Sequence, residues 1–174
     1  MDDLQRRMRL EQLFAAHAGA VRAYARRRID PVSADDTVSE VFAVAWRRLD
    51  DVPEAALPWL LGCARLVLAH QHRRRQRDAA LAERLETAAG PPPPQGDPLL
   101  GWALSQLRDR DRELLLLIAW EGLEPAQAAR ALGCSQNAVA VRLHRARRRL
   151  AAVLRRAEDR MESHPGGFRA EEAS

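Results

Sequence analysis

The chain has 174 residues, 47% of them hydrophobic and 5% aromatic, which is enough for one packed domain or two small ones. Its formal net charge is +4, and all 28 of its basic residues are arginine. No run approaches the ~20 apolar residues of a membrane span, and GxGxxG, P-loop, HExxH and GxSxG patterns are missing, which argues against a membrane protein and against common enzyme classes.

The first helix is predicted over residues 4–28, where apolar side chains recur on one face. It ends at Asp30, because the residue before Pro31 avoids helical backbone angles. Ser33, followed three residues later by Asp36, resembles a capping box and predicts the start of a second helix. That helix carries a regular apolar stripe made of Val38, Val41, Phe42, Ala45, Trp46 and Leu49.

A third helix is predicted from about residue 53 to 77, and it changes from an apolar start (LPWLLGCARLVLA) to a basic end (HQHRRRQR). Residues 87–97 (TAAGPPPPQGD) predict a linker, because four consecutive prolines favour extended polyproline II. The linker divides an N-terminal domain, 1–86, from a C-terminal domain, 98–156.

Helices of the C-terminal domain are predicted near residues 99–107, 110–121, 125–132 and 136–155, and the polar segment 157–174 is predicted to be a disordered tail. Neither half shows the period-2 alternation of strands. The expected fold class is all-α: two small helical domains joined by a Pro-rich linker.

The segment from Glu124 to Arg149 predicts a helix-turn-helix, whose second helix enters the DNA major groove. Pro125 suits the first position of a helix, and Gly133 suits the residue just past its end. Ser135 can cap the second helix through its side-chain oxygen. Eight arginines and no acid lie between residues 125 and 157, so DNA is the expected partner.

The recognition helix presents a set of candidate groove-facing residues: Ser135, Gln136, Asn137, Val141, Arg142, His144 and Arg145. Val139, Leu143 and Leu150 are expected to pack inward. Arg147, Arg148 and Arg149 are expected to contact phosphates, which position a protein without reading sequence.

Two charged groups in the N-terminal half each have two interpretations. Asp35, Asp36 and Glu40 either offset the dipole of their helix or form an acidic docking edge beside the aromatic residues of the same helix. The basic end of the third helix is either a solvated face or a site for an anionic partner. Trp59 is either a core residue or part of a platform for unstacked bases.

The two cysteines and five histidines show no metal-ligand spacing, so we expect no metal, no cofactor and no catalysis. Cys63 and Cys134 are expected to be buried free thiols in a reducing compartment. The first residues, MDDLQRRMRLEQ, lack the apolar core of a signal peptide, which predicts a cytoplasmic protein.

Three segments, in this order, resemble the sigma-70 family of bacterial RNA polymerase initiation factors, and specifically its extracytoplasmic-function (ECF) group. SADDTVSEVFAVAWRRL (33–49) is similar to the family's helix for the polymerase large subunit. PWLLGCARLVLAHQHRRRQR (58–77) is similar to the part that melts and reads the −10 element. The segment 103–150, from ALSQLRDRD to RLHRARRRL, is similar to the domain for the −35 element.

The resemblance implies partners and contact residues. The partners are core RNA polymerase, double-stranded and melted promoter DNA, and an anti-sigma factor, while the factor itself performs no chemistry. The polymerase-binding residues would be Asp35, Asp36, Glu40 and Phe42. The −10 residues would be Trp59, Arg65, Leu66, His70, Arg73 and Arg74, and the −35 residues would be the groove-facing set above.

This chain departs from its relatives at several contact positions. Leu66 and His70 stand where relatives commonly carry asparagine, so −10 specificity cannot be copied from them. Ala140 and His144 replace residues that are often arginine and aromatic. Two alternatives remain: a stand-alone helix-turn-helix regulator that binds operator DNA, and an interaction protein that occupies the polymerase or sequesters a regulator.

Overall fold

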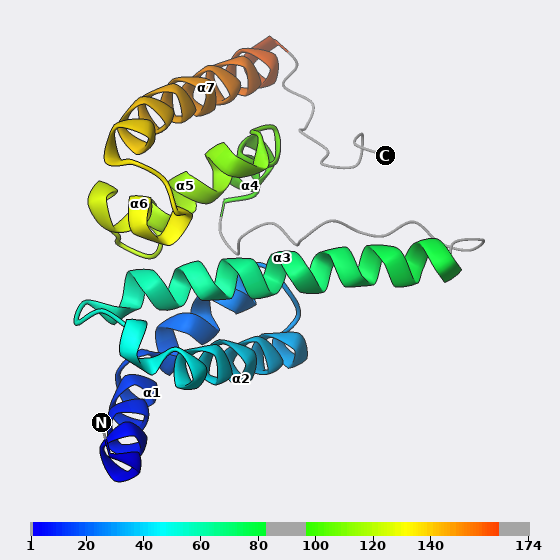
Figure 1. Ribbon diagram of the computed structural model, residues 1–174. Helices are drawn as coiled ribbons and strands as arrows, with labels where there is room; N and C mark the ends of the chain where they lie inside the picture. Colours follow the sequence, from blue (N-terminus) through cyan, green and yellow to red (C-terminus); the bar gives the residue numbers. More distant parts are fainter. Residues whose placement is uncertain (1, 83–96, 164–174) are drawn as a thin grey trace. The chain divides into compact units, whose positions relative to one another are not determined.

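The computed structural model describes residues 2–82 and 97–163, and every regular element in these two stretches is a helix (Figure 1). The chain divides into two compact units. One contains α1–α3, and the other contains α4, α5, α7 and most of α6. The predicted all-α class with two helical domains is therefore confirmed. Of the predicted linker, 87–97, only Asp97 falls within the described residues.

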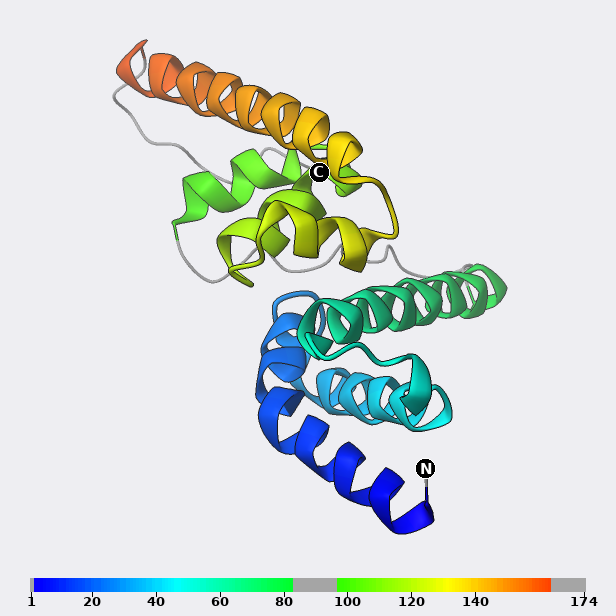
Figure 2. The same cartoon turned by 60° about the vertical axis from the view of Figure 1, so that its left-hand side comes forward.

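The first unit is a bundle of α1 (Asp3–Arg26), α2 (Pro31–Arg47) and α3 (Ala56–Ala82), with a short 3₁₀ turn, η1 (Leu49–Asp51), after α2. Each helix packs against the other two, and α2 and α3 lie side by side in opposite directions (Figures 1 and 2). The apolar stripes predicted from sequence meet at the centre of the bundle. Its fully buried side chains include Val21, Tyr24, Val41, Leu60 and Leu61.

The N-cap of helix α2 lies three residues earlier than predicted. Asp30 is its N-cap, because the Asp30 carboxylate accepts a hydrogen bond from the backbone N–H of Ser33 at 3.0 Å, and Pro31 occupies the first helical turn. This bond, together with one from the Ser33 side chain, lowers the pKa of Asp30 below its ordinary value. The predicted capping box at Ser33 was wrong because Asp-Pro already supplies a cap and a preorganised first turn.

Two arginines in the first turns of α1 contact residues at the end of α2 and just after it. The Arg6 guanidinium lies 5.2 Å from the centre of the Trp46 ring, and its Nη1 is 3.0 Å from Asp50 Oδ2. One helical turn later, Arg9 Nη2 donates to the Val52 carbonyl at 2.7 Å. Trp46 is half-buried by this arrangement, so its ring serves the fold of the unit.

The second unit contains α4 (Pro98–Ser105), α5 (Asp109–Ala119), α6 (Pro125–Leu132) and α7 (Gln136–Ser163). Helices α4 and α5 both pack against α7. Asp97 caps α4 by accepting from the Leu99 N–H at 2.9 Å, as its position before Pro98 predicts. The core of this unit is built of leucine, valine and alanine: Leu104, Leu114, Leu117, Val139, Leu143 and Ala146.

The turn between α6 and α7 has the local geometry that the sequence predicts. Gly133 has a φ of +65°, in the left-handed region that side chains other than glycine avoid. The Cys134 N–H donates to the Ala129 carbonyl at 3.0 Å, and Ser135 Oγ accepts from the Ala138 N–H at 3.2 Å. Helix α6 therefore ends at a left-handed residue, and α7 starts from a serine cap.

Gly133→Ala is expected to lower the free energy of unfolding by about 1–2 kcal/mol, because a Cβ is disfavoured in the left-handed region. Urea unfolding followed by circular dichroism measures this loss. Gly133→Asn is the control, since asparagine tolerates that region and should recover part of the stability. An alanine variant as stable as the wild type would contradict the left-handed turn.

Helix α7 is longer than predicted. It continues to Ser163, and Ala157 in its later half is still buried. The prediction of a disordered tail over 157–174 was therefore wrong for residues 157–163, while 164–174 lie outside the described residues. The polar composition of this segment was misleading, because arginine, glutamate, alanine and methionine are all good helix formers, and no glycine or proline lies between Gly133 and Pro165.

Candidate functional site

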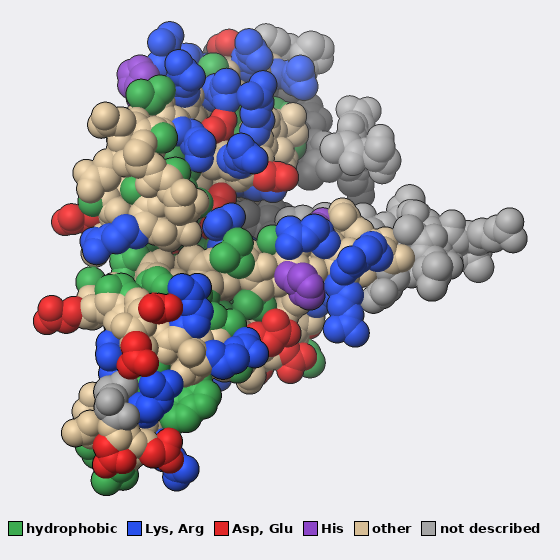
Figure 3. Space-filling view, viewed as in Figure 1, with side chains coloured by type: hydrophobic (Ala, Val, Ile, Leu, Met, Phe, Trp, Pro, Cys, Tyr) green, Lys and Arg blue, Asp and Glu red, His purple; other side chains and the backbone are tan. Residues whose placement is uncertain are grey.

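One edge of α2 is acidic. Asp36 and Glu40 are both exposed and lie one turn apart on the same face of the helix. Asp35 is also exposed but points elsewhere, and its Oδ1 is 2.6 Å from Arg22 Nε of α1. Figure 3 shows the acidic side chains gathered near the start of α2, beside the later part of α3. Two carboxylates on one face can attract a basic partner surface.

Phe42 does not belong to this acidic edge. Its residue exposure is only 6%, and its ring meets Phe14 of α1 edge-on, with ring centroids 4.9 Å apart. We therefore correct its assignment as a contact residue: Phe42 supports α2 from the core side. The sequence could not separate the two roles, because an aromatic residue on an amphipathic helix suits either.

A polar bridge connects the acidic edge of α2 to the middle of α3. Gln71 Nε2 donates to Glu40 Oε1 at 3.2 Å, and Gln71 Oε1 lies 3.3 Å from the hydroxyl of the fully buried Thr37. One turn further along α3, Arg75 Nη2 donates to Ser33 Oγ at 2.7 Å. Sequence analysis missed Gln71 and Arg75 in this role because their partners lie 31 to 42 residues away, and no local pattern marks such pairs.

Helix α3 brings most of the predicted −10 residues onto one face. Trp59, Leu66, His70 and Arg73 recur at helical intervals, and Arg74 borders the same face. Leu66 is 57% exposed although it is apolar, whereas Trp59 is half-buried. Figure 3 shows arginine and histidine side chains along this later part of α3. The face is basic with one exposed apolar side chain, a combination suited to nucleic acid.

Arg65 lies apart from that face, about a third of a turn around the helix. It is half-buried, and its Nε is enclosed without a hydrogen-bond partner among the described residues. The structure thus does not bring Arg65 together with the other five predicted −10 residues.

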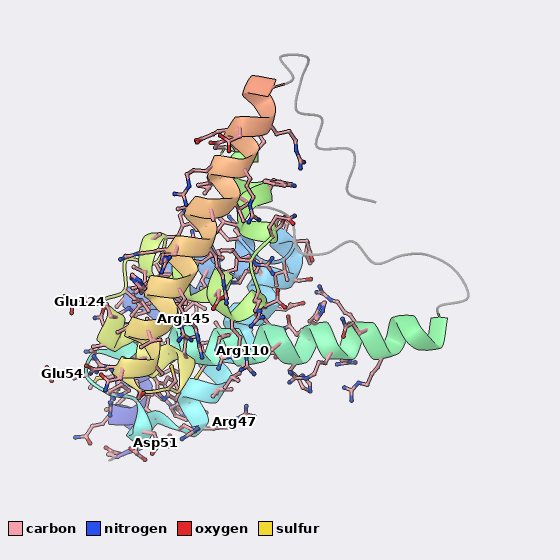
Figure 4. All side chains as sticks on the ribbon, turned by 90° about the horizontal axis from the view of Figure 1, so that it is seen from above. Arg47, Asp51, Glu54, Arg110, Glu124 and Arg145 are labelled. Carbon is pink, nitrogen blue, oxygen red and sulfur yellow. The ribbon has the colours of Figure 1, made fainter. Side chains whose placement is uncertain are left out.

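Helix α7 has a buried side and an exposed basic side. Val139, Leu143 and Ala146 are buried, and the residues opposite them are exposed: Asn137, Val141, His144, Arg145 and Arg148. Val141 is 51% exposed, which is the state required for apolar contact with a thymine methyl group. Arginines gather along α7 in Figure 3, and Figure 4 labels Arg145 on its first half.

The remaining predicted residues of this helix lie at its N-terminal end or at the edge of its exposed face. Ser135 is used as the N-cap, Gln136 is exposed in the first turn, and Arg142 is half-buried. Leu150 is half-buried, in keeping with its inward prediction. Arg149 differs from expectation, because its guanidinium pairs with the Asp111 carboxylate of α5. Part of its guanidinium is therefore engaged within the fold, unlike those of Arg147 and Arg148, for which no ion pair is seen among the described residues.

The cysteines are free and half-buried rather than fully buried. Burial raises the pKa of the Cys63 thiol to about 11, which keeps it protonated and unreactive at neutral pH. Within the described stretches, no three His, Cys, Asp or Glu side chains are grouped to hold a metal ion. None of the helices described in 2–82 and 97–163 is long and apolar enough to cross a bilayer.

Comparison with known proteins places both units in one family. Residues 13–78 match the family description "Sigma-70 region 2", and residues 100–150 match "Sigma-70, region 4". The first match contains the acidic edge of α2 and the basic face of α3, and the second contains the helix-turn-helix. A stand-alone helix-turn-helix regulator is not favoured, because it has no need for a region 2.

Individual relatives agree with this placement. The RNA polymerase sigma factor NccH of Alcaligenes xylosoxydans xylosoxydans is 32% identical over 158 residues, covering 82% of this chain and 85% of NccH. The ECF RNA polymerase sigma factor SigF of Caulobacter vibrioides is 34% identical over 145 residues, covering 79% and 81% of the two chains. The sigma factor RpoE of Bartonella quintana, solved with the anti-sigma factor NepR, superposes with a TM-score of 0.63 at 25% identity, covering 83% of this chain and 96% of RpoE.

Three observations lead to the same conclusion. One unit has a helix-turn-helix with an arginine-rich second helix, and the other has an acidic edge. Relatives above 30% identity match along about four fifths of the chain. The chain belongs to the sigma-70 family, within its ECF group, and is a sigma factor that binds RNA polymerase and directs promoter recognition.

Proposed function

We propose that this sigma factor docks on core RNA polymerase through Asp36 and Glu40 of α2, with Asp35 at the margin of the contact. The supporting observation is the exposure of both carboxylates on one face of a helix whose opposite face is buried. A basic polymerase surface placed against this edge would gain charge complementarity, which favours fast and specific association. Phe42 contributes by holding α2 in place.

We also propose that the first unit reads the −10 element through the face of α3 that carries Trp59, Leu66, His70, Arg73 and Arg74. Arginine can follow the phosphates of a melted strand, and exposed apolar or aromatic side chains can stack on its bases. Leu66 cannot hydrogen-bond a base edge, so this chain should read the −10 element by shape and stacking at that position.

The −35 element is assigned to α7. Asn137, Val141, His144 and Arg145 face solvent together, which is the arrangement that a major-groove reader requires. Arg148 lies on the same side and is suited to a phosphate. Gln136 and Arg142 flank this face. In this proposal, the domain of residues 1–86 binds the polymerase and the −10 element, and the domain of residues 98–156 binds the −35 element. Residues 87–97 link the two domains.

The remaining parts of the proposal follow from the family. The factor performs no chemistry itself, and it works in the cytoplasm because polymerase and promoter DNA meet there. An anti-sigma factor is a further expected partner. Two structurally similar sigma factors, RpoE of Bartonella quintana and CnrH, were solved with NepR and with the cytosolic domain of CnrY, respectively.

The experiment that tests polymerase docking is co-elution of the purified protein with bacterial core RNA polymerase on size-exclusion chromatography at moderate salt. We expect a stable complex, followed by transcription from a subset of genomic DNA fragments. A complex that starts no transcription would favour the interaction protein that occupies the polymerase. Absence of a complex, together with tight binding to DNA alone, would contradict docking through α2.

A further inference from the structure

Asp111 is the one carboxylate in the described stretches whose residue is buried, with an exposure of 6%. It lies in the first turn of α5, where the exposed N–H groups of the helix favour a negative charge. Its backbone N–H donates to the Arg108 carbonyl at 2.9 Å, which closes that turn. The carboxylate thus belongs to a hydrogen-bonded helical turn and is largely withdrawn from water.

The partner of Asp111 comes from the recognition helix. Arg149 Nη1 bonds to Asp111 Oδ2, and the two residues are 38 positions apart in the chain. The Arg149 side chain is 47% exposed, whereas the Asp111 side chain is 9% exposed. The pair therefore joins α5 to α7 at the border of the core, with one partner inside and the other at the surface.

This ion pair restricts the rotation of α7 about its axis more strongly than the surrounding apolar core does. Leu114 and Leu117 of α5 and Leu143 and Ala146 of α7 are apolar and buried. Hydrophobic burial is non-directional, so such contacts tolerate small rotations of one helix about its axis. A charged hydrogen bond between two fixed backbones permits far less rotation.

The rotation of α7 decides where its DNA-facing side chains point. Arg149 follows Arg145 by four residues, so the two side chains leave neighbouring turns of the helix on nearly the same side. Fixing the direction of Arg149 therefore also fixes the direction of Arg145.

We propose that the Asp111–Arg149 pair is a positioning device that sets the rotation of α7 on α5, and that Arg149 itself makes no phosphate contact. Asp111 and Arg149 are thus positioning residues for −35 recognition. The proposal rests on the proposed role of α7 at the −35 element.

The test compares holoenzymes assembled with variant factors, by measuring promoter affinity over a range of salt concentrations. The promoter is one recovered by transcription of genomic fragments, used with its own −35 element and with that element scrambled. Three variants are needed: Arg149→Gln, the double variant Asp111→Asn with Arg149→Gln, and Arg148→Gln as the matched control. The double variant removes both charges and leaves no buried charge unpaired, so it also controls for a folding defect.

Each variant has a distinct expected result. Arg148→Gln should reduce the salt slope of log affinity by about 0.9, the value for one lost phosphate contact. The double variant should keep the wild-type slope, because its net charge is unchanged, but without the charged pair it should bind the intact promoter at least about threefold more weakly than wild type. Arg149→Gln alone leaves Asp111 unpaired and should weaken binding to the intact promoter at least about tenfold, with little change on the scrambled one.

Three outcomes would overturn the proposal. A double variant that loses the same slope as Arg148→Gln would make Arg149 a phosphate contact. If Arg149→Gln lowers the melting temperature but binds the intact promoter like wild type well below melting, the pair is structural only. If wild-type holoenzyme itself shows no preference for the intact −35 element, the assignment of α7 fails, and the positioning role fails with it.

Discussion

Replacing both Asp36 and Glu40 with arginine is expected to abolish stable binding to core RNA polymerase. Two reversed charges against a basic surface cost several kcal/mol, which corresponds to a loss of at least about 100-fold in affinity. The fold should survive, because both side chains are exposed. Among the described residues, the substitution removes the hydrogen bond between Glu40 and Gln71. Size-exclusion co-elution, and a fluorescence titration of labelled factor with core enzyme, would measure the effect.

A matched control is available in the same unit. Glu11 and Glu54 are both exposed, and Figure 4 labels Glu54 after η1, away from the acidic edge. Reversing both of them to arginine changes the net charge by the same amount. We expect near-normal core binding from this control. Equal losses in the two double variants would mean that net charge, rather than the edge of α2, governs the association.

Arg145→Ala should weaken transcription that depends on the −35 element by roughly 5- to 150-fold, the range of one bidentate base contact worth ~1–3 kcal/mol. Arg145 is exposed on the face of α7 that carries Asn137 and Val141. Run-off transcription with reconstituted holoenzyme, on a promoter with an intact or a scrambled −35 element, isolates this contribution. The deficit should disappear on the scrambled promoter, because the wild type has nothing to read there.

Arg155→Ala is the comparison for this variant, since Arg155 is also an exposed arginine of α7 but lies near the end of the helix. It removes the same charge without removing a base contact, so its loss should be small and equal on both promoters. Equal output from wild type and Arg145→Ala on the intact promoter would remove Arg145 from the site. Arg142→Ala should have a smaller effect, because Arg142 is half-buried at the margin of the exposed face.

Features set by neighbouring residues could be predicted from the sequence. The bounds of α6, the start of α7 and the left-handed Gly133 follow from proline, glycine and serine at fixed offsets. Helical periodicity likewise predicted the buried positions Val139 and Leu143. Such signals act over three or four residues, which is the range that a single sequence reveals.

Features that depend on distant partners could not be predicted. Nothing near Arg149 distinguishes it from Arg147 or Arg148, and only the fold brings Asp111 beside it. Phe42 is an aromatic residue on an amphipathic helix, which suits a contact surface, yet Phe14 of α1 packs against its ring. In both cases, the packing of one helix on another chose between roles that the amino-acid type left open.

Gln71 is shared by two surfaces that the proposed function treats separately. Its side chain hydrogen-bonds to Glu40 on the docking helix, while its backbone belongs to α3, between His70 and Arg73. Alleles on these two helices should therefore show epistasis in a genetic screen. A substitution at Glu40 can produce a promoter phenotype, and suppressors of it can arise at Gln71. Asp36 is free of this linkage to Gln71, so its alleles give the cleaner measure of polymerase docking.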